Sequence, residues 1–217
     1  MKILIVFAHP EEKSFNAAMF QTAIKTLAKE GHEVKISDLY KMNFDAVSGK
    51  ENFTILKNPE YFKQQEEELY ASLDNTFSVE ISAEQEKVEW CDVMIWQFPL
   101  YWFSVPAILK GWTDKIFSMG KFYDNGKIFN TGYALGKKAL LAITTGGPEK
   151  NYVHDKYGDI HSILFPISRG IFEFLGFSVL KPEVVYSVER LSQEQRKTVL
   201  DNWAQRLKNI DKEKVLN

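Results

Sequence analysis

The sequence has few of the features that mark secreted, membrane-spanning or nucleic-acid-binding proteins. Its 217 residues include one cysteine, Cys91, so no disulfide can form within the chain, and a reducing, cytoplasmic location is expected. No apolar run is long enough to span a bilayer, and the run 3–8 is too short for a signal peptide. The net charge of -2, with lysines scattered among glutamates, argues against a nucleic-acid partner.

The sequence does contain short apolar runs that alternate with helical patterns, as in βαβ units with a parallel sheet. Strands are expected at residues 3–7, 33–39, 92–98, 138–144 and 177–186. Helices are expected at residues 15–29, 83–90, 105–117, 160–175 and 192–210. Because crossovers between parallel strands are right-handed, these helices must cover both faces of a doubly wound sheet.

The alternation is interrupted once, at about residues 40–82. This stretch contains Gly49, Asn58-Pro59 and the acidic run 66–68, without a sustained strand pattern. We therefore expect one domain over residues 1–217 with an insertion that is partly helical. Ligands of such sheets bind outside the carboxyl ends of the strands. Three loops follow strand ends there, at residues 9–16, 98–103 and 144–147.

The first loop leads from His9 into the helix that begins near Phe15. Ser14 can cap this helix, and the free amides at a helix start form an anion site. His9 and Lys13 add hydrogen-bond donors. Since the loop lacks the glycine spacing of an NTPase or dinucleotide fingerprint, it favours a phosphate site of the flavodoxin kind. The alternative is a capped helix beside a polar loop.

The second loop is aromatic where polar turn residues are usual. It runs Gln97-Phe98-Pro99-Leu100-Tyr101-Trp102-Phe103. Exposed aromatic side chains at a strand end can stack on a planar ring system. The alternative is a buried hydrophobic corner.

The third loop, Thr144-Thr145-Gly146-Gly147, combines two hydroxyls with two glycines. Glycine allows backbone amides to approach a ligand closely. Amides aimed at the N1 edge of a flavin would favour its negatively charged reduced form. The alternative is an ordinary glycine-rich turn. Each loop alone is weak support for a ligand site, but three at one sheet edge predict a flavin site.

Other candidate residues do not form a recognisable site. His154, Asp155, Asp159 and His161 do not have the spacing of a usual metal site, so no metal is expected. Cys91 lies between Trp90 and Asp92 and is expected to be a buried apolar side chain rather than a nucleophile.

Several stretches closely resemble the NAD(P)H:quinone oxidoreductase (DT-diaphorase) family of flavoproteins, in its short form without the extra carboxyl-terminal domain. The likeness extends to about residue 210, and residues 97–112 are its most specific part. The matching stretches are Ser14-Phe15-Asn16, Ser37-Asp38-Leu39-Tyr40, Gln97-Phe98-Pro99-Leu100, Val105-Pro106-Ala107-Ile108-Leu109-Lys110-Gly111-Trp112 and Ile143-Thr144-Thr145-Gly146-Gly147. The resemblance implies a flavodoxin-like, five-stranded parallel sheet in the order 2-1-3-4-5.

The resemblance also implies FAD, with FMN as the alternative, and NADPH or NADH as the hydride donor. The residues implied to contact FAD are His9, Ser14, Phe15, Asn16, Pro99, Leu100, Tyr101, Trp102, Phe103, Thr144, Thr145, Gly146, Gly147 and Arg196. The family is a homodimer with its active site at the subunit interface. The residues implied to contact substrate are Trp102 and Phe103, together with Tyr123, Asn125 and Phe174 of the partner chain.

The catalytic pair of the family is a tyrosine and a histidine, and only the tyrosine, Tyr152, is matched here. Tyr157 occupies the histidine position, with His154 as a weaker substitute. A phenol can donate a hydrogen bond to a developing anion but carries no positive charge near neutral pH. Tyr101 and Lys63 also replace family glutamines. These departures bear on the acceptor and the efficiency rather than on the fold.

The resemblance predicts an enzyme that passes a hydride from NAD(P)H through the flavin to a quinone-like acceptor in a ping-pong, two-electron reaction. One alternative is an ancillary regulatory subunit that associates peripherally with a potassium-efflux transporter. Another is a flavodoxin-like electron carrier. The aromatic second loop disfavours the carrier, as does the small net charge.

Overall fold

The computed structural model describes residues 1–153 and 157–216. It contains a parallel sheet in the order β2-β1-β3-β4-β5, which confirms the flavodoxin-like order. The first four strands are β1 (Lys2–Phe7), β2 (Glu33–Asp38), β3 (Val93–Pro99) and β4 (Lys138–Thr144). Strands β1, β3 and β4 are almost entirely buried, since helices cover both faces of the sheet.

The expected fifth strand is interrupted. Two short segments, β5 (Ser178–Val179) and β6 (Glu183–Val185), each pair in parallel with β4. Pro182 lies between them and has no backbone N–H to donate to a ladder. The prediction of one continuous strand over 177–186 is therefore wrong in detail, although its position beside β4 is confirmed.

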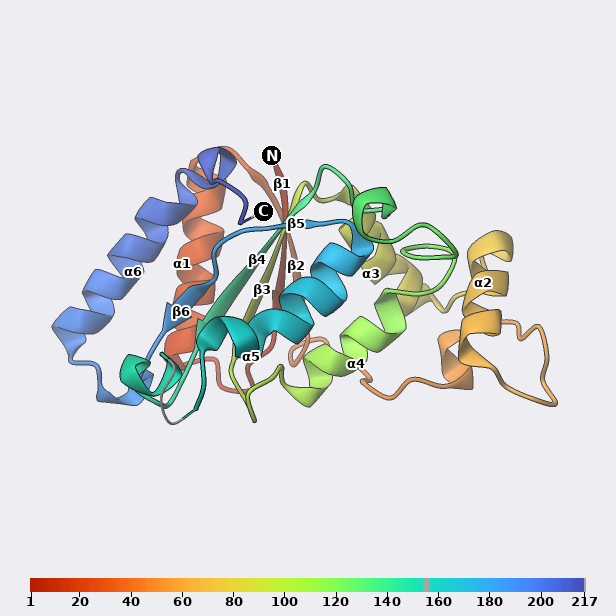
Figure 1. Ribbon diagram of the computed structural model, residues 1–217, viewed down its shortest axis with the longest axis horizontal. Helices are drawn as coiled ribbons and strands as arrows, with labels where there is room; N and C mark the ends of the chain where they lie inside the picture. Colours follow the sequence, from red (N-terminus) through yellow and green to blue (C-terminus); the bar gives the residue numbers. More distant parts are fainter. Residues whose placement is uncertain (154–156, 217) are drawn as a thin grey trace.

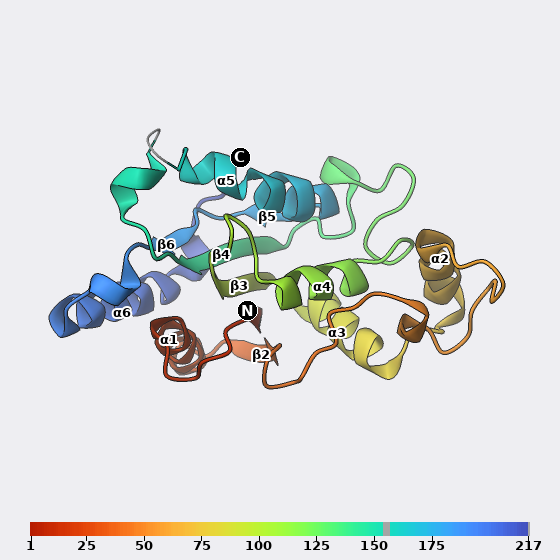
Figure 2. The same ribbon diagram turned by 90° about the horizontal axis from the view of Figure 1, so that it is seen from below.

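Two helices cover one face of the sheet. They are α1 (Phe15–Lys29) and α6 (Gln193–Leu207), which lie side by side in Figures 1 and 2. Ile3, Ile5 and Phe7 of β1 face this layer and pack into a core with apolar residues of both helices. Trp203 of α6 is fully buried there and donates its indole N–H to the Met19 carbonyl at 3.1 Å.

The other face is covered by α3 (Val79–Trp90), α4 (Ala107–Ile116) and α5 (Ile160–Ile167), as Figure 2 shows. The alternate residues of the strands, such as Leu4, Met94 and Trp96, pack against these helices. Helix α3 begins four residues before the expected start, at the Ser78 cap. Beyond Pro166, the expected helix 160–175 continues as a π-helix over Ser168–Glu173. A proline inside a helix removes one hydrogen bond of the regular ladder.

The stretch between β2 and α3 carries α2 (Gln64–Asp74), which projects beyond the sheet on the right of Figure 1. Two adjacent buried carboxylates anchor it. Glu67 accepts hydrogen bonds from the backbone N–H groups of Lys57 and Asn58 at 2.6 and 2.9 Å. Glu68 accepts one from the Met119 N–H at 2.8 Å, which ties α2 to the loop after α4.

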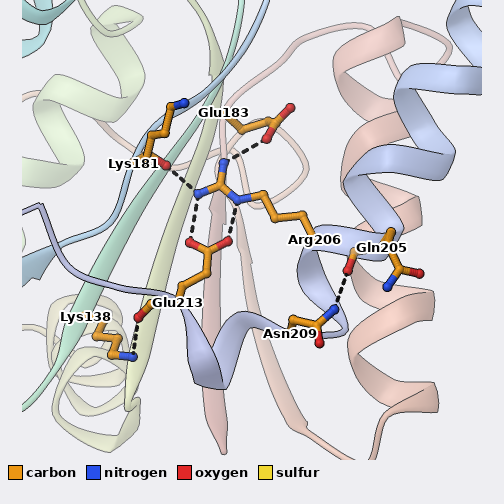
Figure 3. Close-up of polar contacts among 7 residues, drawn as sticks. All are labelled: Lys138, Lys181, Glu183, Gln205, Arg206, Asn209 and Glu213. Carbon is orange, nitrogen blue, oxygen red and sulfur yellow. Dashed lines mark hydrogen bonds and ion pairs between the residues drawn. The ribbon is translucent and has the colours of Figure 1, made fainter.

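The carboxyl-terminal segment covers part of the β5 edge of the sheet. Val215 forms an antiparallel bridge with Leu180, and Arg206 holds the segment in place (Figure 3). The Arg206 guanidinium contacts both carboxylate oxygens of Glu213, at 2.6 and 2.9 Å, and Glu183 at 2.8 Å. Pairing of this kind reduces the number of free backbone groups that this part of the edge offers to other chains. Among the described residues, no helix has the length and apolar character needed to cross a membrane.

Candidate active site

Hydrogen bonds join the three predicted loops at the carboxyl ends of the strands, the lower edge of the sheet in Figure 1. The Asn16 amide donates to the Thr144 hydroxyl at 2.9 Å, and the Gln97 amide donates to the Asn16 carbonyl at 3.1 Å. The Leu100 N–H donates to the Thr144 carbonyl at 2.9 Å. The structure thus brings the first, second and third loops together.

The first loop lines a pocket of about 340 Å³ at the start of α1. Ser14 is the predicted cap and accepts a hydrogen bond from the Ala17 N–H at 3.0 Å. The first amides of the helix have no acceptor within the helix and are available to an anion. The predicted residues that line this pocket are His9, Ser14, Phe15, Asn16, Thr144 and Arg196.

Arg196 of α6 contributes a positive charge to this pocket. The Arg196 guanidinium lies 5.2 Å from the centre of the Phe15 ring and donates to the backbone carbonyls of Val188 and Leu191. No carboxylate pairs with Arg196 in the described part of the chain, although Glu189 also lines the pocket. Burial lowers the pKa of His9, whose Nδ1 accepts the Glu11 N–H at 3.0 Å. The uncompensated guanidinium therefore suits a phosphate.

The second loop holds its aromatic side chains on a tight two-residue turn. Tyr101 and Ser104 exchange backbone hydrogen bonds of 3.0 and 2.9 Å, and Trp102 and Phe103 between them have φ values of 50° and 59°. Bulky residues rarely adopt this left-handed conformation, which costs about 1–2 kcal/mol per residue. Trp102 is 96% exposed, so the alternative of a buried hydrophobic corner is wrong for this side chain. Pro99 and Leu100 link the turn to the buried end of β3.

The third loop lines a second pocket, of about 550 Å³, together with Tyr152, Tyr157 and Phe103. The centre of the Tyr157 ring lies 5.4 Å from that of Tyr152 and 5.7 Å from that of Phe103. A Cβ atom at Gly147 would lie 3.1 Å from both tyrosine rings, so glycine allows this close packing. Thr145 is buried behind the loop and donates to the Gly147 carbonyl at 2.9 Å.

The two tyrosines differ in burial. Tyr152 is buried whereas Tyr157 is exposed, and burial raises the pKa of Tyr152 above its ordinary value. The Tyr152 phenol is therefore protonated at neutral pH and can donate a hydrogen bond into the pocket. His154, the suggested substitute for the family histidine, lies outside the described residues.

A fourth loop, residues 186–191, completes both pockets and was missed by the sequence analysis. The Ser187 N–H donates to the Gly147 carbonyl at 3.1 Å, and the Val188 N–H donates to the Thr145 carbonyl at 3.2 Å. Val188 and Glu189 line the first pocket, and Arg190 lines the second. The position of this loop after the last strand was the available signal, because the carboxyl ends of parallel strands share one edge.

The residues expected from a partner chain lie elsewhere. Tyr123 and Phe174, whose ring centres are 5.7 Å apart, line a pocket of about 490 Å³ that shares no residue with the other two. Asn125 is exposed on the same loop as Tyr123. In Figure 1 this green loop lies near α2 and away from the carboxyl ends of the strands. Within one chain, these residues are not brought to Tyr152 and Tyr157.

Among the described residues, two buried side-chain oxygens lie beneath the site. Asn16 Oδ1 and Gln97 Oε1 have no hydrogen-bond partner in the described part of the protein. A buried acceptor without a partner is costly. The described residues contain no group of three His, Cys, Asp or Glu side chains arranged to bind a metal.

The doubly wound parallel sheet with its site at the strand ends defines a flavodoxin-like α/β protein. The chain belongs to the family described as flavodoxin-like fold (Flavodoxin_2), whose model matches residues 1–209.

Two curated relatives and one solved structure are similar over most of the chain. The ribosyldihydronicotinamide dehydrogenase [quinone] of Rattus norvegicus is 44% identical over 100% of this chain and 94% of that protein. NAD(P)H dehydrogenase [quinone] 1 of Cavia porcellus is 42% identical over 96% of this chain and 77% of that protein. The structure of a putative quinone reductase from Klebsiella pneumoniae has a TM-score of 0.95 at 35% identity, over 100% of this chain and 87% of that one.

Proposed function

We propose that this protein is a flavin-dependent NAD(P)H dehydrogenase that reduces quinones or related acceptors. The observation that carries the proposal is the arrangement at one sheet edge of a phosphate-type pocket, an exposed aromatic turn and a tyrosine-lined pocket. Relatives named as quinone dehydrogenases match the chain at nearly full length, which supports the same conclusion.

FAD is the proposed cofactor, with FMN as the alternative. The amides at the start of α1, capped by Ser14, would hold its phosphates together with His9 and Arg196. The aromatic turn would lie against the ring system. When bound, the flavin supplies two-electron hydride chemistry between a nicotinamide and a quinone.

The residues of the chain would control charge and water around that chemistry. Tyr152 holds its proton at the hydroxyl oxygen and, with the amides of Gly146 and Gly147, would provide hydrogen-bond donors to a flavin held in this pocket. Tyr157 adds a second phenol at the mouth of the pocket. Trp102 and Phe103 would orient donor and acceptor rings by stacking and exclude water from the reacting faces. Donor and acceptor would use the same pocket in turn.

We further propose a homodimer in which Tyr123, Asn125 and Phe174 of one chain complete the acceptor pocket of the other. The separation of the Tyr123 pocket from the Tyr152 pocket within one chain supports this arrangement. The test is complementation between a Tyr123→Ala chain and a Tyr152→Phe/Tyr157→Phe chain. Mixed dimers should recover activity because one of their two sites is intact. No recovery in mixtures shown by native mass spectrometry to contain mixed dimers would refute it.

The main test is direct. The purified protein should be yellow and oxidise NADH or NADPH with menadione as acceptor. Arg196→Gln should weaken flavin binding, whereas Arg169→Gln is the matched control because Arg169 is exposed and pairs with Glu173, away from both pockets. A colourless protein that takes up neither FAD nor FMN on reconstitution would overturn the proposal.

The two alternative roles lead to different outcomes. An electron carrier would accept electrons without a nicotinamide site, so it would show no oxidation of NADH or NADPH. An ancillary transporter subunit would co-purify with a membrane partner from the native host. Both roles stay predictions from the sequence, and the exposed aromatic turn favours the enzyme.

A further inference from the structure

Two cations without ion-pair partners line the tyrosine pocket. Lys150 and Arg190 both line it beside Gly146, Gly147 and Tyr152, and both are exposed. Neither side chain forms an ion pair or a hydrogen bond within the described ranges, 1–153 and 157–216. Because both cations line the same pocket, an anionic ligand bound there could contact both.

The backbone fixes where these cations lie. Lys150 belongs to a short 3₁₀ helix, Glu149–Tyr152, that ends at the buried Tyr152. Arg190 ends the 3₁₀ helix Val188–Arg190, which follows Ser187 in the left-handed conformation, at φ 51°. Because the Ser187 N–H donates to the Gly147 carbonyl, the loop that carries Arg190 is joined directly to the glycine loop of the pocket.

In the part of the chain that the structure describes, no carboxylate lines the tyrosine pocket with these two cations. Glu149 lines a different pocket with His161 and Arg206, and Glu189 lines the phosphate-type pocket at the start of α1. Each acidic residue is adjacent in sequence to one of the cations but lines another cavity. The described lining of the tyrosine pocket therefore carries a local positive charge, although the chain has a net charge of -2.

We propose that Lys150 and Arg190 form a subsite for a phosphate group of the hydride donor. The chain would accordingly prefer phosphate-bearing nicotinamides, the dinucleotides or the mononucleotide, to the phosphate-free ribosyl form. This inference rests on the proposed function, because it needs a nicotinamide beside the tyrosine pair. An uncharged ribosyl donor leaves both cations without a partner, whereas a phosphate forms charge-assisted hydrogen bonds with them.

The experiment compares kcat/KM for four reduced donors with menadione as acceptor. The donors are ribosyldihydronicotinamide without phosphate, reduced nicotinamide mononucleotide with one phosphate, NADH and NADPH. The variants are Lys150→Gln, Arg190→Gln and the double substitution. Lys25→Gln is the charge-matched control, because Lys25 is exposed on α1 and lines none of the pockets described here.

Each single variant should lower kcat/KM for phosphate-bearing donors by about three- to fivefold, and the double variant by about tenfold, as for partly exposed ion pairs. Ribosyldihydronicotinamide should be oxidised at the wild-type rate by all variants. The first donor in the series to show the loss identifies the phosphate that is bound. Added salt should lower wild-type kcat/KM for NADPH and affect the double variant less.

Binding gives an independent readout. Calorimetric titration of the flavin-loaded protein with 2′-phospho-ADP-ribose should show about tenfold weaker binding by the double variant. The subsite would be overturned if the ratio of kcat/KM for phosphate-bearing donors to kcat/KM for ribosyldihydronicotinamide were equal in the wild type and the double variant. A loss of FAD affinity in the double variant would also overturn it, because the cations would then bind the flavin. If wild-type protein oxidises none of the four donors, the proposed function itself fails.

Discussion

Replacing Trp102 by asparagine is expected to stabilise the fold and to weaken catalysis. Trp102 has a φ of 50° and is 96% exposed, so it bears the cost of a left-handed conformation with almost no compensating burial. That cost is about 1–2 kcal/mol for most residues, and asparagine tolerates the conformation better. We expect the free energy of unfolding to rise by about 1 kcal/mol, which for a chain of this size raises Tm by about 2–4 °C.

The activity should change in the opposite direction. If Trp102 stacks on the reacting rings, its loss removes about 0.5–1.5 kcal/mol, and kcat/KM should fall by up to about tenfold. The assays are thermal unfolding of the flavin-free protein and steady-state NADPH oxidation. Trp102→Ala is the matched control because alanine keeps the unfavourable backbone conformation while removing the ring. Alanine should lower activity equally without the gain in Tm. Equal Tm values for the asparagine and alanine variants would refute the strain argument.

Two further predictions concern single groups. The Tyr152→Phe/Tyr157→Phe protein should reduce its flavin about 10²- to 10³-fold more slowly, the usual loss for one donor to a developing anion, and stopped-flow reduction at the wild-type rate would disprove the assignment. Burial raises the pKa of the Cys91 thiol from 9.0 to about 11, so the folded protein retains a proton that the unfolded chain loses. Stability should therefore fall as the pH rises from 9 to 11, by about 2–3 kcal/mol. Urea unfolding measured across this pH range should show that the Cys91→Ala protein lacks this decrease in the free energy of unfolding.

Periodicity and residue type were enough to predict most of the fold. Buried runs such as 3–7 identify strands because only the centre of a parallel sheet buries both faces of a strand. Ser14 and Ser192 mark helix starts, since their hydroxyls accept free amides. The interruption of the last strand at Pro182 was foreseeable but was not predicted, and the π-helix after Pro166 depends on packing that no local pattern reveals.

The candidate site was less predictable than the fold. The first and third loops lie at the strand ends as expected, but nothing in the order Tyr101-Trp102-Phe103 reveals two consecutive left-handed residues. That conformation follows from the paired backbone of Tyr101 and Ser104, which closes the turn. The fourth loop was missed because Ser187, Val188 and Arg190 match no motif and meet the glycine loop only through the sheet.

The sequence by itself determined the class of protein: a parallel sheet with a ligand site at its carboxyl edge, and loops chemically suited to a flavin. It did so because strand burial, helix capping and glycine placement are local requirements. Only the tertiary structure decided how that edge is divided. It separated a phosphate-type pocket from a tyrosine pocket, placed Tyr123 and Phe174 away from both, and brought Lys150 and Arg190 together. Lys150 and Arg190 are 40 positions apart in the sequence, and the pairing of β4 with β6 brings them into one pocket.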